Sequence, residues 1–183
     1  MKLKQVVLSM LSLTGLSSCI SLQQNAIDMA TTKIVYSEHS NSGYAIYTTY
    51  EICADSLVWE YDEARNTCHL KDVSRYNIDA FKQLLSDLSA ISFSAKDAND
   101  HSVGGSGWSI SFENSNGSYF SYNNLFKLSG NYQHVNEVLM SFVRNHQPNG
   151  YKLFKKYQAE PHEGAMYGEF KELPEALKSY SVP

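Results

Sequence analysis

Several short stretches of the chain alternate apolar and polar residues, which is the pattern of strands with one buried face. In residues 108–113, for example, Trp108, Ile110 and Phe112 alternate with serines and a glutamate. Aromatic residues, at 13% of the chain, also favour a sheet. The strands predicted in this way cover residues 33–38, 44–53, 56–61, 68–70, 108–113 and 118–122.

Two stretches change to a helical period, with apolar residues at steps of three and four. They are residues 77–90 and 131–146. Asn77 is placed to cap the first helix, and Asp79 adds a negative charge to its first turn. A further short helix is expected at residues 174–180, opening at Pro174.

The connection between the last two strands fixes their register. A two-residue turn at Asn116-Gly117 would place Phe112 opposite Ser121 and send the apolar residues to opposite faces. A three-residue loop, with Gly117 in a left-handed conformation, places Phe112 opposite Phe120. We therefore predict the three-residue loop.

Strands and helices are segregated along the chain, which predicts an α+β fold. We expect an antiparallel sheet of about five to six strands, with two helices packed on one face and a C-terminal tail. The domain is predicted to span residues 33–146, and residues 147–183 form the C-terminal extension. We expect residues 151–183 to be a mobile contact segment. The alternative is that Phe154, Tyr157, Phe170 and Leu177 dock individually into the domain.

The N-terminus has the organisation of a secretory signal peptide. Lys2 and Lys4 are the only charges before Asp28, and a short apolar run at residues 6–16 follows them. That run is shorter than the roughly 20 residues a spanning helix needs. Residues 1–18 are therefore predicted to be removed on export.

The run ends in Leu16-Ser17-Ser18-Cys19, which resembles the lipobox of bacterial lipoproteins. The resemblance implies cleavage before Cys19 and acylation (palmitate included) of this residue. Residues 19–32 would then be a tether from the lipid to the domain. In that family an Asp after the Cys favours inner-membrane retention; Ile20 stands here, so we expect the outer membrane, facing the periplasm or the surface.

Two further cysteines, Cys53 and Cys68, remain once lipid has taken Cys19. An even number of cysteines in an oxidising compartment suggests a disulfide. A Cys53–Cys68 bridge would close a loop of about 15 residues, which the chain-entropy model values at roughly 3 kcal/mol. The alternative is two separate buried thiols.

Charge and motifs exclude several function classes. The net charge is −4, and no basic cluster suggests nucleic acid as a partner. Asp97, Asn99 and His101 have the spacing of the first calcium-loop ligands, but Ser102 and Trp108 stand where glycine and glutamate are needed. The glycine run at 104–107 lacks the context of a nucleophile elbow. We assign no catalytic residue, no metal site and no cofactor.

The order of elements resembles, in layout, the small emfourin-type protease-inhibitor domains. The likeness covers the opening strand at 34–43, the helix at 77–90, the hairpin at 108–122 and the closing helix. The function expected from the sequence is a membrane-anchored, non-catalytic binding module with an envelope protein or a glycan as partner. The alternatives are an envelope hydrolase and a protease inhibitor. The aromatics proposed for contact are Tyr47, Trp59, Tyr61 and Tyr119; the other reading is that they pack the sheet.

Overall fold

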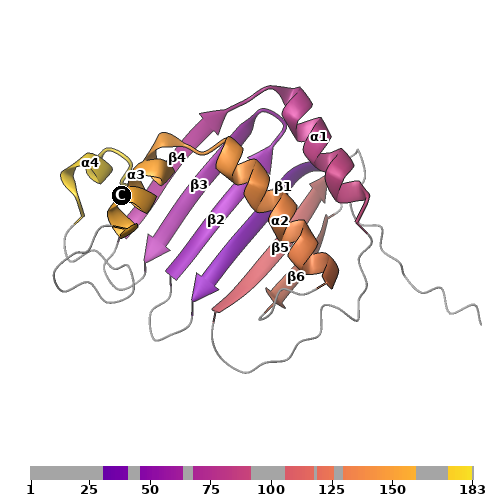
Figure 1. Ribbon diagram of the computed structural model, residues 1–183, viewed down its shortest axis with the longest axis horizontal. Coiled ribbons are helices and arrows are strands. Elements are labelled where there is room, and N and C mark those ends of the chain that lie inside the picture. The colour runs from indigo at the N-terminus through magenta and orange to yellow at the C-terminus, as the bar shows by residue number, and fades with distance from the viewer. Residues whose placement is uncertain are drawn as a thin grey trace, which may run out of the picture.

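The computed structural model describes residues 31–40, 46–63, 68–91, 106–117, 119–125, 130–159 and 173–182 (Figure 1). These residues form six strands and four helices. The strands are β1 (Thr31–Ser40), β2 (Ile46–Cys53), β3 (Ser56–Glu63), β4 (Cys68–Arg75), β5 (Ser106–Asn114) and β6 (Tyr119–Leu125). The helices are α1 (Ile78–Ser89), α2 (Gly130–Asn145), α3 (Asn149–Ala159) and α4 (Glu175–Lys178).

All six strands belong to one antiparallel sheet, in the order β4-β3-β2-β1-β5-β6. The first four strands follow one another as a meander, and β5 and β6 form a hairpin. The hairpin joins the meander at β1, where Ile34 lies opposite Phe112 and Tyr36 opposite Ile110. The predicted α+β class with an antiparallel sheet is confirmed.

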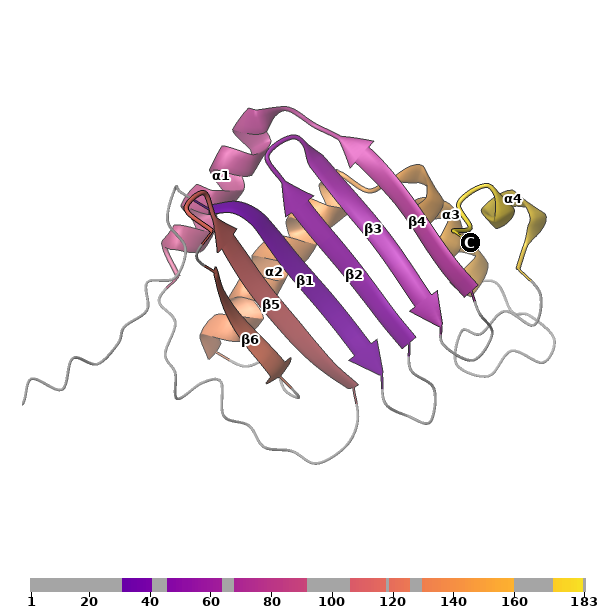
Figure 2. The ribbon, with the colours of Figure 1, turned by 180° about the vertical axis from the view of Figure 1, so that it is seen from behind.

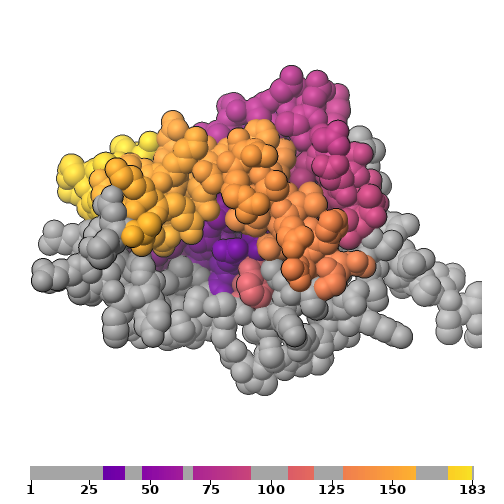
Figure 3. Space-filling model, in the orientation of Figure 1, coloured from indigo at the N-terminus to yellow at the C-terminus, as the bar shows by residue number. Residues whose placement is uncertain are grey.

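The helices lie on one face of the sheet and bury its apolar side chains (Figure 1). Figure 3 shows α2 and α3 covering this face, with purple sheet atoms visible between them. The sheet contributes Ile34, Tyr36, Tyr50, Ile52, Leu57, Trp59, Tyr61, Leu70, Ile110 and Phe112 to the core. Burying a single large apolar side chain of this kind stabilises the fold by about 1.5–3 kcal/mol. Among the described residues, no helix combines the length and apolarity needed to cross a membrane.

Helix α1 forms as its sequence predicts. The Asn77 side chain accepts a hydrogen bond from the Asp79 amide at 3.0 Å, which satisfies one of the free donors of the first turn. The apolar stripe Phe81, Leu84, Leu85 and Leu88 is buried. Helix α1 packs against α2, whose buried stripe includes Val135, Leu139 and Phe142.

The β5–β6 hairpin has the predicted register. Phe112 lies opposite Phe120. Gly117 has φ of 79°, the left-handed conformation that glycine adopts at no steric cost, and its amide donates to the Asn114 carbonyl at 2.9 Å. The three-residue loop is confirmed.

The C-terminal extension packs on the domain, so the expectation of a mobile tail is wrong for the described parts of it. Pro148 leads directly into α3, a helix that the sequence pattern did not predict and that buries Tyr151 and Phe154. Leu177 of α4 is also buried. The last residues pair with the edge of β4, where the Lys71 amide donates to the Tyr180 carbonyl and the Val182 amide to the His69 carbonyl. The docking alternative holds for Phe154 and Leu177, whereas Phe170 lies outside the described residues.

The second face of the sheet carries no described helix (Figure 2). Its residues are the odd-numbered positions of β1, β2, β4 and β5 and the even-numbered positions of β3, because their neighbours face the core. We call this the open face. It is mostly polar, with Ser37, Thr49 and Glu60 among its half-buried residues.

Substitution of Phe154 tests whether α3 is part of the core. The ring lies 4.5 Å from the Tyr61 ring and 5.3 Å from the Trp59 ring, centroid to centroid. Phe154→Ala should lower the free energy of unfolding by about 3–5 kcal/mol, because it removes a buried ring and leaves a cavity. Urea denaturation measures the change, with exposed Lys156→Ala as the control on the same helix. A loss below about 1 kcal/mol would show that α3 is not docked.

Candidate functional site

The two cysteines predicted to form a disulfide are free thiols in this fold. Cys53 ends β2 beside the turn that leads into β3, whereas Cys68 pairs with Glu63 at the far end of β3. The length of β3 separates them by about 20 Å, and a disulfide needs Cα atoms about 4.4–6.8 Å apart. The predicted Cys53–Cys68 bridge is therefore wrong. The sequence showed the spacing of the two residues but not the strand between them.

Both thiols are half-buried and poorly ionised. Burial raises the pKa of Cys53, and the nearby Glu51 carboxylate raises it further. Burial together with the carboxylates of Glu63 and Asp62 raises the pKa of Cys68 to about 11. Since the thiolate is the reactive form, neither residue has the environment of a nucleophile.

The other candidate residues from the sequence fall mostly outside the described part. The structure does not describe Cys19, the 97–102 loop or Gly104-Gly105. Of the glycine run it describes only Ser106 and Gly107, which belong to β5. Within the described ranges, no group of three or more His, Cys, Asp or Glu side chains is arranged to hold a metal ion.

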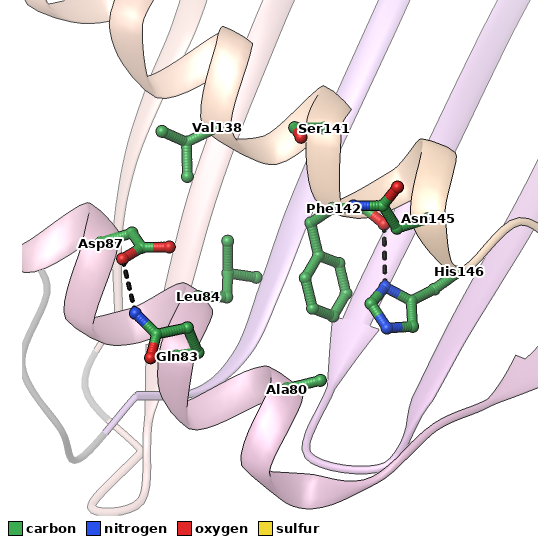
Figure 4. A pocket seen from close by; sticks show the side chains of 9 residues that line it. All are labelled: Ala80, Gln83, Leu84, Asp87, Val138, Ser141, Phe142, Asn145 and His146. Carbon is green, nitrogen blue, oxygen red and sulfur yellow. Dashed lines mark hydrogen bonds between the residues drawn. The ribbon is translucent and has the colours of Figure 1, made fainter.

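A groove of about 310 Å³ runs between α1 and α2. Its apolar lining comes from Ala80 and Leu84 of α1 and from Val138 and Phe142 of α2 (Figure 4). Its polar lining residues are Gln83, Asp87, Ser141, Asn145 and His146. Ser, His and Asp together raise the question of a hydrolase triad.

The geometry of the groove does not form that triad. Figure 4 shows Asp87 and His146 at opposite ends of the groove. Asp87 accepts a hydrogen bond from Gln83 at 2.8 Å, and His146 Nδ1 donates to the Phe142 carbonyl at 3.0 Å. A triad needs that same Nδ1 to donate to the carboxylate. The His146 ring instead packs on Phe142 and Tyr76, with centroids 4.3 and 4.9 Å away.

The aromatic residues proposed for contact separate into two groups. Trp59 and Tyr61 are fully buried under α3, so they pack the core. The side chain of Tyr119 lies outside the described part. Tyr47 is different, because it lies on the open face and is 43% exposed. It is the one described residue of the four that can contact a ligand.

Tyr47 belongs to a row of residues that crosses five strands at one end of the open face. Cross-strand pairing places Gly107, His39, Tyr47, Asp62 and His69 side by side, from β5 through β1, β2 and β3 to β4. The His39 and Tyr47 rings stack with centroids 6.3 Å apart. A Cβ atom on Gly107 would lie only 2.5 Å from His39 Cε1, so the His39 ring rests directly on the glycine backbone. We call His39 and Tyr47 the ring pair.

The next row along the strands carries hydroxyl groups. It contains Ser109, Ser37 and Thr49 in that order, and the Ser37 and Thr49 hydroxyls are 3.1 Å apart. Sequence reasoning identified Tyr47 but missed His39, Gly107 and Asp62. Only the register of three strand pairs brings these residues together, and no local pattern in the sequence signals it.

Glu60 organises the charges beside these rows. His69 Nε2 lies 2.6 Å and Lys71 Nζ 3.3 Å from its two carboxylate oxygens. Burial on its own would raise the pKa of Glu60, but the hydrogen bonds from His69 and Lys71 outweigh that effect. The pKa of Glu60 therefore lies below its usual value.

Alkylation without reductant tests the state of the thiols. Unfolded, unreduced Cys19→Ala protein should take up two iodoacetamide groups by mass, at Cys53 and Cys68. In the folded protein the reaction at pH 7 should be slow and should accelerate as the pH rises, because the pKa of both thiols is raised. Modification of the two cysteines only after reduction would show that a Cys53–Cys68 disulfide exists.

A pH series tests the Glu60 cluster. Because folding lowers the pKa of Glu60, its stabilisation is present above the unfolded-state value and is lost as the pH falls through the folded-state value. Glu60→Gln should lower the free energy of unfolding at pH 7 by up to about 1 kcal/mol, and the difference should vanish once the pH has fallen below the folded-state pKa. Glu51→Gln on the same face is the control. An equal loss for Glu60→Gln at pH 3 and pH 7 would contradict the electrostatic origin.

Comparisons with protein families, with curated proteins and with solved structures give no match for this chain.

Proposed function

We propose that the protein is a lipid-anchored, non-catalytic binding protein of a bacterial cell envelope. The observation that carries the proposal is Leu16-Ser17-Ser18-Cys19, which follows a basic start and a short apolar run. Acylation at Cys19 would anchor the chain, since each buried CH₂ contributes about 0.8 kcal/mol and two or more acyl chains hold a protein stably.

The anchor and the domain are close together along the chain. Strand β1 begins at Thr31, so the path from Cys19 to the sheet cannot exceed about 40 Å. A domain held at that distance meets other components of the envelope at a high local concentration. With Ile20 after the cysteine, we place the anchor in the outer membrane.

Binding fits the described surfaces better than hydrolysis. In the α1–α2 groove, Asp87 and the His146 imidazole are engaged with other partners and lie at opposite ends. The open face, in contrast, presents an exposed aromatic ring beside hydroxyl and carboxylate groups on a rigid sheet. Such a combination offers apolar area and hydrogen-bonding groups to a partner.

Replacement of Cys19 tests the anchor. Cys19→Ala should remain unprocessed and should lose metabolic labelling by an alkyne or azide analogue of palmitate. Cys53→Ala is the matched control, because it removes a cysteine from the folded domain and should keep both processing and label. Normal labelling of Cys19→Ala would overturn the proposal.

A further inference from the structure

The ring pair is a packed, partly exposed platform. Tyr47 is 43% exposed, although its own strand lies between two others in the sheet. The ring is held by the stack with His39, and His39 in turn lies on the Gly107 backbone. A ligand that packs on Tyr47 would therefore cost little side-chain conformational entropy on binding.

Hydrogen-bonding groups flank the platform on two sides. Asp62, next to Tyr47 on β3, is exposed, and no ion pair of the described residues involves it. Thr49 lies two residues from Tyr47 on β2, and Ser37 lies two residues from His39 on β1, so both are on the same face as the ring pair. Their hydroxyls donate as well as accept, and the Asp62 carboxylate accepts from two directions.

The charges of the open face argue against an anionic ligand. Lys33 pairs with Glu113 at 2.9 Å, Lys71 with Glu60 at 3.3 Å and Arg75 with Asp55 at 2.7 Å. Cations of the face are thus matched by carboxylates, and no excess of positive charge is left to attract an anionic polymer. The rings offer apolar contact, and Asp62, Thr49 and Ser37 offer hydrogen bonds, which suits a ligand with an apolar face and hydroxyl groups.

We infer that the ring pair with Asp62, Thr49 and Ser37 binds an uncharged, extended glycan strand. A pyranose ring has this chemistry, because its C–H bonds pack on the negative face of an aromatic ring while its hydroxyls point outward. A β-linked chain is also flat enough to lie along a sheet surface. The inference rests on the proposed function, for which it names the class of partner.

The acylated protein, purified in a zwitterionic detergent without a sugar head group, is titrated with chitohexaose and followed by saturation-transfer NMR. We expect a dissociation constant of the order of 0.1–1 mM, as suits one aromatic platform with a few hydrogen bonds. Maltohexaose, an α-linked chain that coils, should bind at least about tenfold more weakly.

Three variants locate the site. Tyr47→Ala should raise the dissociation constant about tenfold, whereas Tyr47→Phe, which keeps the ring, should stay within about threefold of the parent. Gly107→Ala should also weaken binding, because the added Cβ displaces His39 without removing any contacting group. Val73→Ala is the matched control, since Val73 is 45% exposed on the same face but two strands away from Tyr47. Unchanged thermal unfolding midpoints would show that Tyr47→Ala still folds.

Each of three results would overturn the inference. They are absence of chitohexaose binding up to 10 mM, equal effects of Tyr47→Ala and Val73→Ala, and a dimer of this chain that buries Tyr47. These outcomes leave palmitate labelling at Cys19 unaffected. Absence of palmitate labelling in the unmutated protein would overturn the lipid-anchored function, and the glycan titration of the purified chain would remain interpretable.

Discussion

The pairing of β1 with β5 holds the two halves of this sheet together. Among the described strands, only β1 of the meander and β5 of the hairpin connect the two halves, and the residues that they align are about 75 positions apart in the chain. On the helix face this pairing joins Ile34 to Phe112 in the core. On the open face it puts Gly107 under His39 and so builds the platform for Tyr47. Core and candidate site therefore depend on one register, since a shift by one residue would exchange the two faces.

The core and its border contain several tyrosines, and the hydroxyls of Tyr36 and Tyr76 bond to groups of other elements. Tyr36 donates to Asn136 of α2 at 2.6 Å, and the Tyr76 hydroxyl donates to the Ser56 carbonyl at 2.9 Å. Burial raises the pKa of Tyr36 far above its usual value, so the phenol remains a hydrogen-bond donor at any physiological pH. Such bonds fix how the helices and loops lie on the sheet, because a buried hydroxyl without a partner is costly.

The C-terminal segment protects one edge of the sheet. Strand β4 would otherwise expose unpaired amides and carbonyls, which are a template for aggregation. Residues 180–182 pair with it, while Asp72 of β4 accepts the Gly150 amide at the start of α3 at 2.7 Å. At Gly150 a Cβ atom would lie 2.8 Å from the Tyr180 ring, so the glycine permits the close approach of these segments. The extension is thereby tied to the domain at two places, and the exposed ring pair lies elsewhere, on the open face.

The sequence alone determined the features that rest on local chemistry. Alternation located six strands, the cap at Asn77 placed α1, and apolar parity with Gly117 fixed the hairpin register, because each depends on neighbouring residues only. The lipid site at Cys19 is also a local motif and stays a prediction from the sequence. Tertiary structure decided the rest. It separated Cys53 from Cys68 by the length of β3. It also docked α3, which is held by packing against Trp59 and Tyr61 and has only a short apolar stripe in its sequence. It also brought Gly107, His39, Tyr47 and Asp62 together. Long-range strand pairing is set by the packing of the whole sheet, so no single stretch of sequence predicts it.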